Sequence, residues 1–221
     1  MEIRKMIDHF VLKYLAVPRP PKVSEDKKLV ACIGDSITFG AGVQGRKEKT
    51  WEYYLNEILG DKIQVLNYGI SGRTLQKEGD YPYTAEKFYD ISRQLRADIY
   101  LIMLGTNDAK PYNWKKDRYH EELITFSKSY LMTGGKVILM TPPMCFPEEK
   151  TGVVAFDIDE KTINDIVPEI VRKAAEELSL PLIDLRSFTE GHSEWFDDGV
   201  HPNAEGNKAI AGYIAEELKK K

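Results

Sequence analysis

From residue 29 to the C-terminus, short apolar runs alternate with longer segments in which apolar residues recur at helical spacing. Each short run has the length of a buried strand and ends at a glycine, a proline or a polar residue. This alternation predicts repeated βαβ units, and hence an α/β fold with a parallel sheet covered by helices on both faces. We expect five strands, at residues 29–33, 63–68, 99–104, 136–140 and 182–185.

The longer segments predict the helices of these units, at residues 50–59, 84–95, 119–132, 161–178 and 203–219. The last of these helices carries its apolar residues on one face and has Asn203 as its N-cap. A long segment without regular pattern, residues 142–159, follows the fourth strand. Open α/β sheets bind ligands at the carboxyl ends of their strands, so we expect this loop to lie beside a functional site.

The first 28 residues differ from the rest of the chain. Apolar residues at helical spacing predict an amphipathic helix over residues 1–15, and a proline-rich segment at 18–21 predicts an extended linker. We therefore divide the chain into an N-terminal arm, residues 1–28, and one domain, residues 29–221. The arm is expected to dock on its own domain, with docking on a second subunit of a homo-oligomer as the alternative.

Composition narrows the class of protein. The 221 residues fit one domain, and 42% hydrophobic residues with 30% charged residues are ordinary for a globular enzyme. A net charge of −4 offers no basic excess for nucleic acid. No stretch approaches the roughly 20 apolar residues of a membrane span. Charged residues interrupt the N-terminus, which indicates a cytoplasmic protein without a secretory signal, although a removed signal peptide would leave no trace.

Cysteine and histidine are too sparse for a metal centre. Cys32 lies inside a predicted strand and Cys145 in a loop, and neither has the spacing of a zinc site or a disulfide framework. Of the four histidines, His201 alone has an aspartate at a spacing suited to chemistry. We expect no metal and no cofactor.

A serine, a histidine and an aspartate near the two ends of the domain could form a nucleophile and its base. Ser36 follows the first predicted strand, and Asp198 precedes His201 by three residues. A serine hydroxyl needs a base within hydrogen-bond reach and a third group to orient that base. We assign these roles to Ser36, His201 and Asp198.

Two further polar positions follow predicted strands and could hold the oxyanion formed by attack on an ester. Gly72 lacks a Cβ and lets its N–H approach substrate closely, and the amide of Asn107 donates without carrying charge. With the N–H of Ser36, these groups form the expected oxyanion hole. We expect structural roles for Asp35 and Asp108, which bond to the backbone of their loops.

Taken together, the four motifs resemble those of the SGNH (GDSL-type) hydrolase family: GDSITFG at 34–40, NYGISG at 67–72, GTND at 105–108 and DGVHPN at 198–203. The resemblance implies the same catalytic assignments for Ser36, Gly72, Asn107, Asp198 and His201. It also implies a three-layer α/β/α sandwich with the flavodoxin-like strand order 2-1-3-4-5 and a shallow site. Family members hydrolyse varied acyl esters and thioesters. The resemblance therefore implies which type of bond is hydrolysed, but it does not identify the acyl group or the alcohol of the substrate.

Three side chains near the predicted site are candidates for substrate contact. Trp114 and Trp195 could form platforms for a sugar or an acyl group. Arg73 could contact an anionic or hydroxyl-rich substrate, with a local salt bridge as the equal alternative.

The leading hypothesis is a serine esterase that removes a short acyl group, acetyl above all, from a carbohydrate. The first alternative is a lysophospholipase or acyl-thioester hydrolase, in which apolar residues of the 142–159 loop form an acyl groove: Met144, Phe146, Val153, Val154 and Phe156. The second alternative is a non-catalytic sugar-binding protein on the same fold, which predicts a lost triad residue, and none is lost.

Overall fold

The computed structural model describes residues 17–149 and 151–220. Its core is a sheet of five parallel strands in the order β2-β1-β3-β4-β5. The strands are β1 (Lys28–Gly34), β2 (Ile63–Gly69), β3 (Ile99–Met103), β4 (Lys136–Thr141) and β5 (Leu182–Asp184). The predicted α/β class, strand order and five strand positions are confirmed.

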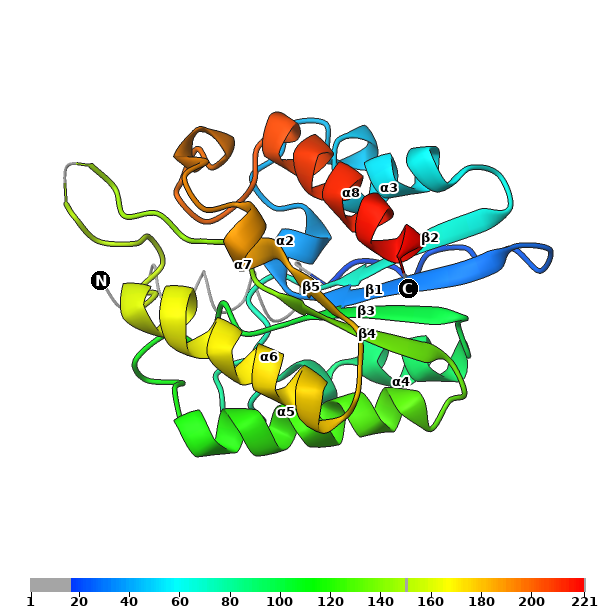
Figure 1. Cartoon of the computed structure of the whole chain (residues 1–221), viewed down its shortest axis with the longest axis horizontal. Helices are drawn as coiled ribbons and strands as arrows, with labels where there is room; N and C mark the ends of the chain where they lie inside the picture. Colours follow the sequence, from blue (N-terminus) through cyan, green and yellow to red (C-terminus); the bar gives the residue numbers. More distant parts are fainter. Residues whose placement is uncertain (1–16, 150, 221) are drawn as a thin grey trace.

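Helices cover both faces of the sheet, as Figure 1 shows. On one face lie α3 (Trp51–Leu59) and α8 (Ala204–Lys219), and on the other lie α4 (Lys87–Gln94), α5 (Lys116–Leu131) and α6 (Val167–Glu177). Asn203 caps α8 as predicted, because its side chain accepts the N–H of Gly206 at 3.1 Å. The predicted three-layer α/β/α sandwich is confirmed. Two helices were not predicted, α2 (Ser36–Phe39) and α7 (Leu185–Phe188), since four residues are too few to show a helical period.

Strand register brings the functional loops together. Gly34, at the end of β1, pairs with Gly69 on one side and with Met103 on the other. The strands β1, β2 and β3 therefore end at the same height, and the loops that follow them begin side by side at one edge of the sheet. The motifs at 34–40, 67–72 and 105–108 meet there because parallel strands present their carboxyl ends on the same side.

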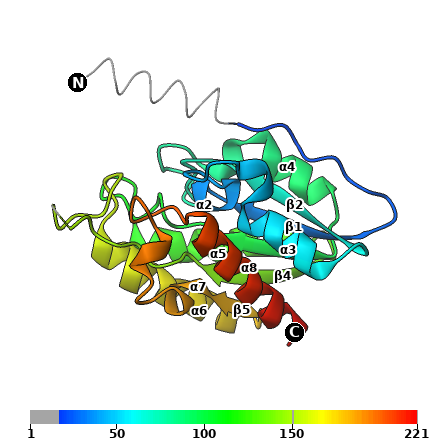
Figure 2. The ribbon, with the colours of Figure 1, turned by 90° about the horizontal axis from the view of Figure 1, so that it is seen from above.

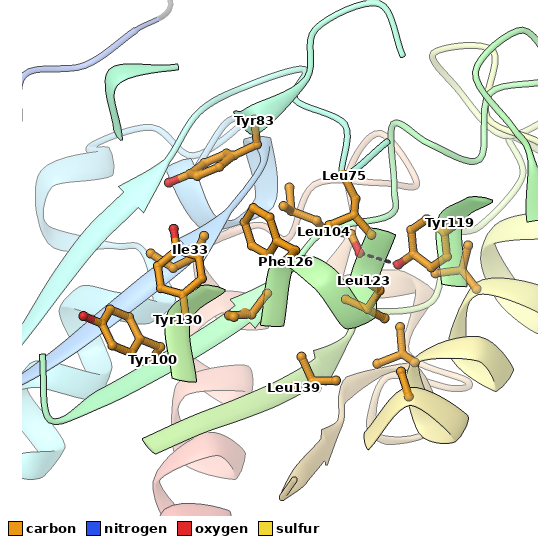
Figure 3. Close-up of a cluster of buried hydrophobic side chains, with 14 of the residues drawn as sticks. Ile33, Leu75, Tyr83, Tyr100, Leu104, Tyr119, Leu123, Phe126, Tyr130 and Leu139 are labelled. Carbon is orange, nitrogen blue, oxygen red and sulfur yellow. Dashed lines mark hydrogen bonds between the residues drawn. The ribbon is translucent and has the colours of Figure 1, made fainter. Parts of the chain in front are cut away.

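Each face of the sheet has its own apolar core. The face under α3 and α8 buries aliphatic residues around Trp51. The opposite face is rich in aromatic residues, of which Figure 3 shows Tyr83, Tyr100, Tyr119, Phe126 and Tyr130 among the buried side chains. There the hydroxyl of Tyr119 donates to the carbonyl of Leu104 at 2.8 Å, which anchors the end of β3 before the Gly105–Asp108 motif. A buried tyrosine hydroxyl needs such a partner.

The described part of the arm, residues 17–27, runs beside the edge strand β2 (Figure 2). Gln64 of β2 holds it, because its side chain accepts the N–H of Ser24 at 2.8 Å and donates to the carbonyl of Lys22 at 2.9 Å. These bonds show docking on the arm's own domain over this segment. The helix predicted at 1–15 lies outside the described residues, and the division of the chain at residue 28 stays a prediction.

A π-helical turn, η4 (Thr162–Ile166), opens the helix that continues as α6. Pro168 explains it, because proline lacks the N–H that would bond to the carbonyl of Asn164 in a regular helix. Arg186 donates to that carbonyl instead, at 2.9 Å. The side chain of Asn164 bonds both the N–H and the carbonyl of Cys145, at 2.9 and 2.8 Å. The turn thus fixes the start of the long loop after β4.

The loop between β4 and η4 extends beyond the end of the sheet in both views (Figures 1 and 2). The turns around η5 (Ser193–Trp195) lie at the same end. None of the helices in the described part of the chain has the length and apolarity to cross a bilayer.

Candidate active site

Ser36 stands at the end of β1, as the first residue of the short helix α2. Asp35 caps this helix, and its Oδ1 accepts the N–H of Ile37 at 3.0 Å. The cap closes the turn between strand and helix immediately, so the serine is held at the carboxyl edge of the sheet.

A continuous chain of hydrogen bonds joins Ser36, His201 and Asp198. The Oγ of Ser36 lies 2.9 Å from Nε2 of His201, and Nδ1 of His201 lies 2.7 Å from Oδ2 of Asp198. Oδ1 of Asp198 accepts the backbone N–H groups of Val200 and His201, at 2.9 and 2.7 Å. The turn between Asp198 and His201 is therefore built around the carboxylate that orients the imidazole.

The environment of Asp198 keeps it ionised. Partial burial raises the pKa of this carboxyl, but the bond from His201, its charge and the two backbone N–H groups outweigh burial and leave the pKa below its ordinary value. An ionised Asp198 accepts a hydrogen bond from the Nδ1–H of His201, which leaves Nε2 of His201 free to accept the proton of Ser36. The arrangement has the geometry that a general base requires.

Gly199 lets the turn between Asp198 and His201 lie against the loop after β4. Its φ is +77°, and a Cβ there would lie 2.2 Å from the carbonyl oxygen of Phe146. That loop in turn bonds to the turn, because the N–H of Phe146 donates to the carbonyl of Gly199 at 2.8 Å. An alanine at 199 would meet both an unfavourable backbone and a backbone clash.

We expect Gly199→Ala to lower both the melting temperature and the esterase rate, because the turn that carries His201 must shift. The control is Gly191→Ala, where φ is +81° but nothing lies within 4 Å of the added Cβ. Both variants carry the left-handed penalty of about 1 kcal/mol, and the clash should add about 1–3 kcal/mol at Gly199 alone. Equal melting temperatures for the two variants would contradict this account.

Gly72 and Asn107 lie beside Ser36 and line the same pocket. Gly72 has a φ of +81°, which glycine adopts without strain. The amide nitrogen of Asn107 donates to the carbonyl of Arg73 at 3.3 Å, and it makes no second hydrogen bond among the residues that the structure describes. Because the amide has two N–H groups, one is available to a substrate oxygen.

Asp108 joins the two loops that carry Gly72 and Asn107. Its two carboxyl oxygens accept the N–H groups of Leu75 and Gln76, at 2.9 and 2.8 Å, and its side chain is fully buried. Burial raises the pKa of Asp108 to about 7, even though the two N–H groups act in the opposite direction. These contacts agree with the structural role expected for Asp108.

Asp35 is buried as well, and burial raises its pKa to about 6 from an ordinary value of 3.8, with the Ile37 N–H and His201 opposing the change. At Asp35 the folded state therefore binds a proton more tightly than the unfolded state, so the contribution of Asp35 to stability falls as the pH rises from about 4 to above 6. We expect Asp35→Asn, which can still accept from Ile37, to remove this loss of about 3 kcal/mol. Urea unfolding of the native protein and of Asp35→Asn between pH 4 and 8 measures the free energy of unfolding of each. The control is Asp61→Asn, at an exposed position. If the free energies of the native protein and of Asp35→Asn changed in parallel with pH, the expected effect of Asp35 would be contradicted.

A small pocket of about 160 Å³ opens beside Ser36 and His201. It is smaller than the roughly 300–1,000 Å³ of sites for drug-sized ligands. Its remaining lining comes from loops after β1, β2, β3 and β4 and from the turn before His201: Ala41, Ser71, Gly72, Thr106, Asn107, Lys110, Phe156, Ile158 and Val200. The five residues assigned from the sequence to catalysis and the oxyanion hole thus come within reach of one small pocket, because Asp198 reaches it through His201.

The geometry does not favour the predicted substrate contact of Arg73, which stays a prediction. Its side chain is fully buried, and its guanidinium bonds to Glu86 at 2.7 Å and to the carbonyl of Ser71 at 2.7 Å. The alternative, a local salt bridge, is confirmed. Arg73 holds the loop after β2 in place and does not line the pocket.

Neither predicted tryptophan lines the pocket. Trp114 packs against Tyr119, with ring centroids 5.3 Å apart, and borders the aromatic core. Trp195 stacks on His192 at 3.9 Å. Contact of either ring with a substrate stays a prediction that this geometry does not favour.

Of the apolar residues proposed for an acyl groove in the loop after β4, Phe156 alone lines the pocket. Val154 is buried, Val153 is exposed, and Phe146 packs on Phe196. No sequence pattern pointed to Ile158, or to Lys110, which lies three residues after Asn107. Their place at the pocket depends on loop conformation.

Known proteins of similar sequence and fold identify the family of this chain. The profile of the GDSL-like Lipase/Acylhydrolase family matches residues 30–214. The chain therefore belongs to the family of GDSL-like lipases and acylhydrolases, which are carboxylic ester hydrolases.

Three similar proteins carry names within this class. The acetylxylan esterase of Xylanibacter ruminicola is 32% identical over 90% of this chain, which spans only 45% of that enzyme. The arylesterase of Vibrio mimicus is 28% identical over 89% of this chain and 91% of its own. The crystal structure of a carbohydrate acetylesterase from Sinorhizobium meliloti superposes with a TM-score of 0.70 at 22% identity, covering 88% of this chain and 99% of that one, and shows a shared fold.

Proposed function

We propose that the chain hydrolyses a short acyl ester, acetyl above all, of a carbohydrate, through an acyl-enzyme on Ser36. The observation that carries the proposal is the hydrogen-bonded series Ser36–His201–Asp198, of which Ser36 and His201 line a small pocket. A pocket of this size fits a short acyl group better than a long chain. The names of the acetylxylan esterase and of the carbohydrate acetylesterase favour a sugar as the alcohol.

In the proposed reaction, Oγ of Ser36 attacks the acyl carbon while Nε2 of His201 takes its proton. The oxyanion accepts hydrogen bonds from the N–H of Ser36, the N–H of Gly72 and the amide of Asn107. When the intermediate collapses, His201 gives the proton to the leaving alkoxide. Water then attacks the acyl-enzyme with His201 again as base, which releases the acid and restores Ser36.

The test is a panel of p-nitrophenyl esters from acetate to palmitate, with acetylated xylose and lysophosphatidylcholine beside them. Activity confined to acetyl and other short esters, including the sugar, supports the proposal. Rates that grow with chain length, or turnover of lysophosphatidylcholine, would overturn it in favour of the lipase or thioesterase alternative.

A further inference from the structure

Phe156 is a large apolar side chain in an unusual position. It is 53% exposed, yet it lines the pocket with Ser36 and His201. Its ring lies edge-on to the imidazole of His201, with centroids 5.3 Å apart and planes at 72°. An exposed phenylalanine against a catalytic base gains little from burial, so its place calls for another reason.

The backbone at Phe156 is strained. Its φ is +63°, and that of Asp157 is +58°. Aspartate tolerates this left-handed region, whereas a bulky residue such as phenylalanine rarely adopts it. Such outliers gather at functional sites, where the surrounding structure enforces them.

The residues on either side of Phe156 enforce this conformation. Val154 and Ile158 are both buried in the core, and the N–H of Asp159 donates to the carbonyl of Ala109 at 3.1 Å. The chain between these anchors has few residues in which to turn. The turn therefore projects the ring of Phe156 over the pocket.

We propose that Phe156 sets the upper limit on the length of the acyl group. The acyl chain extends from Ser36 toward Phe156 and Ile158, and the aromatic ring leaves room for acetyl and blocks longer chains. Ile158 is buried and cannot yield, whereas the ring of Phe156 forms the exposed wall. The inference rests on the proposed esterase function and adds the residue that decides its acyl preference.

The test compares kcat/KM for p-nitrophenyl butyrate and acetate in three variants. Phe156→Ala opens the wall and should raise the butyrate-to-acetate ratio at least tenfold. Phe156→Trp enlarges the wall and should lower the ratio. Val153→Ala is the control, because Val153 is exposed on the same loop and does not line the pocket; its ratio should stay within twofold of the native value.

A ratio within twofold of native in Phe156→Ala would overturn the proposal, as would an equal rise in Val153→Ala. If Phe156 instead contacted the alcohol of the ester, Phe156→Ala would leave the butyrate-to-acetate ratio unchanged. It would then alter the ratio of kcat/KM between p-nitrophenyl acetate and ethyl acetate, and this result would also overturn the proposal. Failure of the proposed function is a separate result: the Ser36→Ala protein would then keep its activity on acetate. Because Phe156 is half exposed, its replacement should leave the melting temperature close to native.

Discussion

Replacing Ser36 by alanine is expected to lower kcat for p-nitrophenyl acetate by about 10⁴–10⁶-fold, as is replacing His201. Each variant removes one end of the 2.9 Å bond between Oγ and Nε2, and without it neither attack nor proton transfer proceeds. Asp198→Ala should cost less, about 10⁴-fold, because the aspartate orients the base and does not transfer the proton itself. Combining two of these changes should add little, since the three residues act as one unit.

The matched controls are Ser193→Ala and His192→Ala. Ser193 is exposed, and His192 stacks on Trp195 and bonds to Glu194 away from the pocket. Both should keep kcat within a few-fold of native. Full activity in the Ser36→Ala protein would show that another group is the nucleophile, and loss of activity in His192→Ala would show that the base is wrongly assigned.

Replacing Asn107 by alanine is expected to lower kcat by about 10²–10³-fold with little change in KM. The amide would bond to the oxyanion of the transition state more strongly than to the neutral carbonyl of the ester, so its loss raises the barrier and hardly affects substrate binding. Steady-state kinetics on p-nitrophenyl acetate measures both parameters.

Asn107→Asp serves as the companion variant, since it keeps the shape of the side chain and replaces the amide donors with a carboxyl. A loss at least as large as that of Asn107→Ala is expected, because the carboxyl offers no amide donor and its negative charge opposes the oxyanion. If Asn107→Asp retained native kcat, the amide would not be part of the oxyanion hole. Melting temperatures must accompany the rates, because the amide also donates to the carbonyl of Arg73.

Much of the site could be predicted because its residues follow strands directly. Ser36 comes two places after β1 and Asn107 four places after β3, and residues this close to the end of a buried parallel strand lie at the carboxyl edge of the sheet. Asp198 and His201 required only a turn of four residues, whose spacing already favours a bond between the two side chains. In these cases the residue type and its position along the chain were enough to predict a place in the site.

Arg73 shows where that reasoning stops. It stands next to Gly72 and carries a charge, which suggests a surface contact, yet its guanidinium points inward to Glu86, thirteen residues later in the chain. Whether an arginine faces solvent or a partner depends on the packing of both segments. A local pattern of polarity does not contain that information.

The sequence by itself determined the layers of this protein, its strand and helix positions and the polar groups at the carboxyl edge, because apolar periodicity and strand ends are local properties. The tertiary structure decided which side chains close the pocket. Phe156 covers it because buried anchors on both sides force a left-handed turn, and Trp195 is kept away because its ring stacks on His192. These outcomes depend on contacts between segments that are distant along the chain, so only the folded structure could decide them.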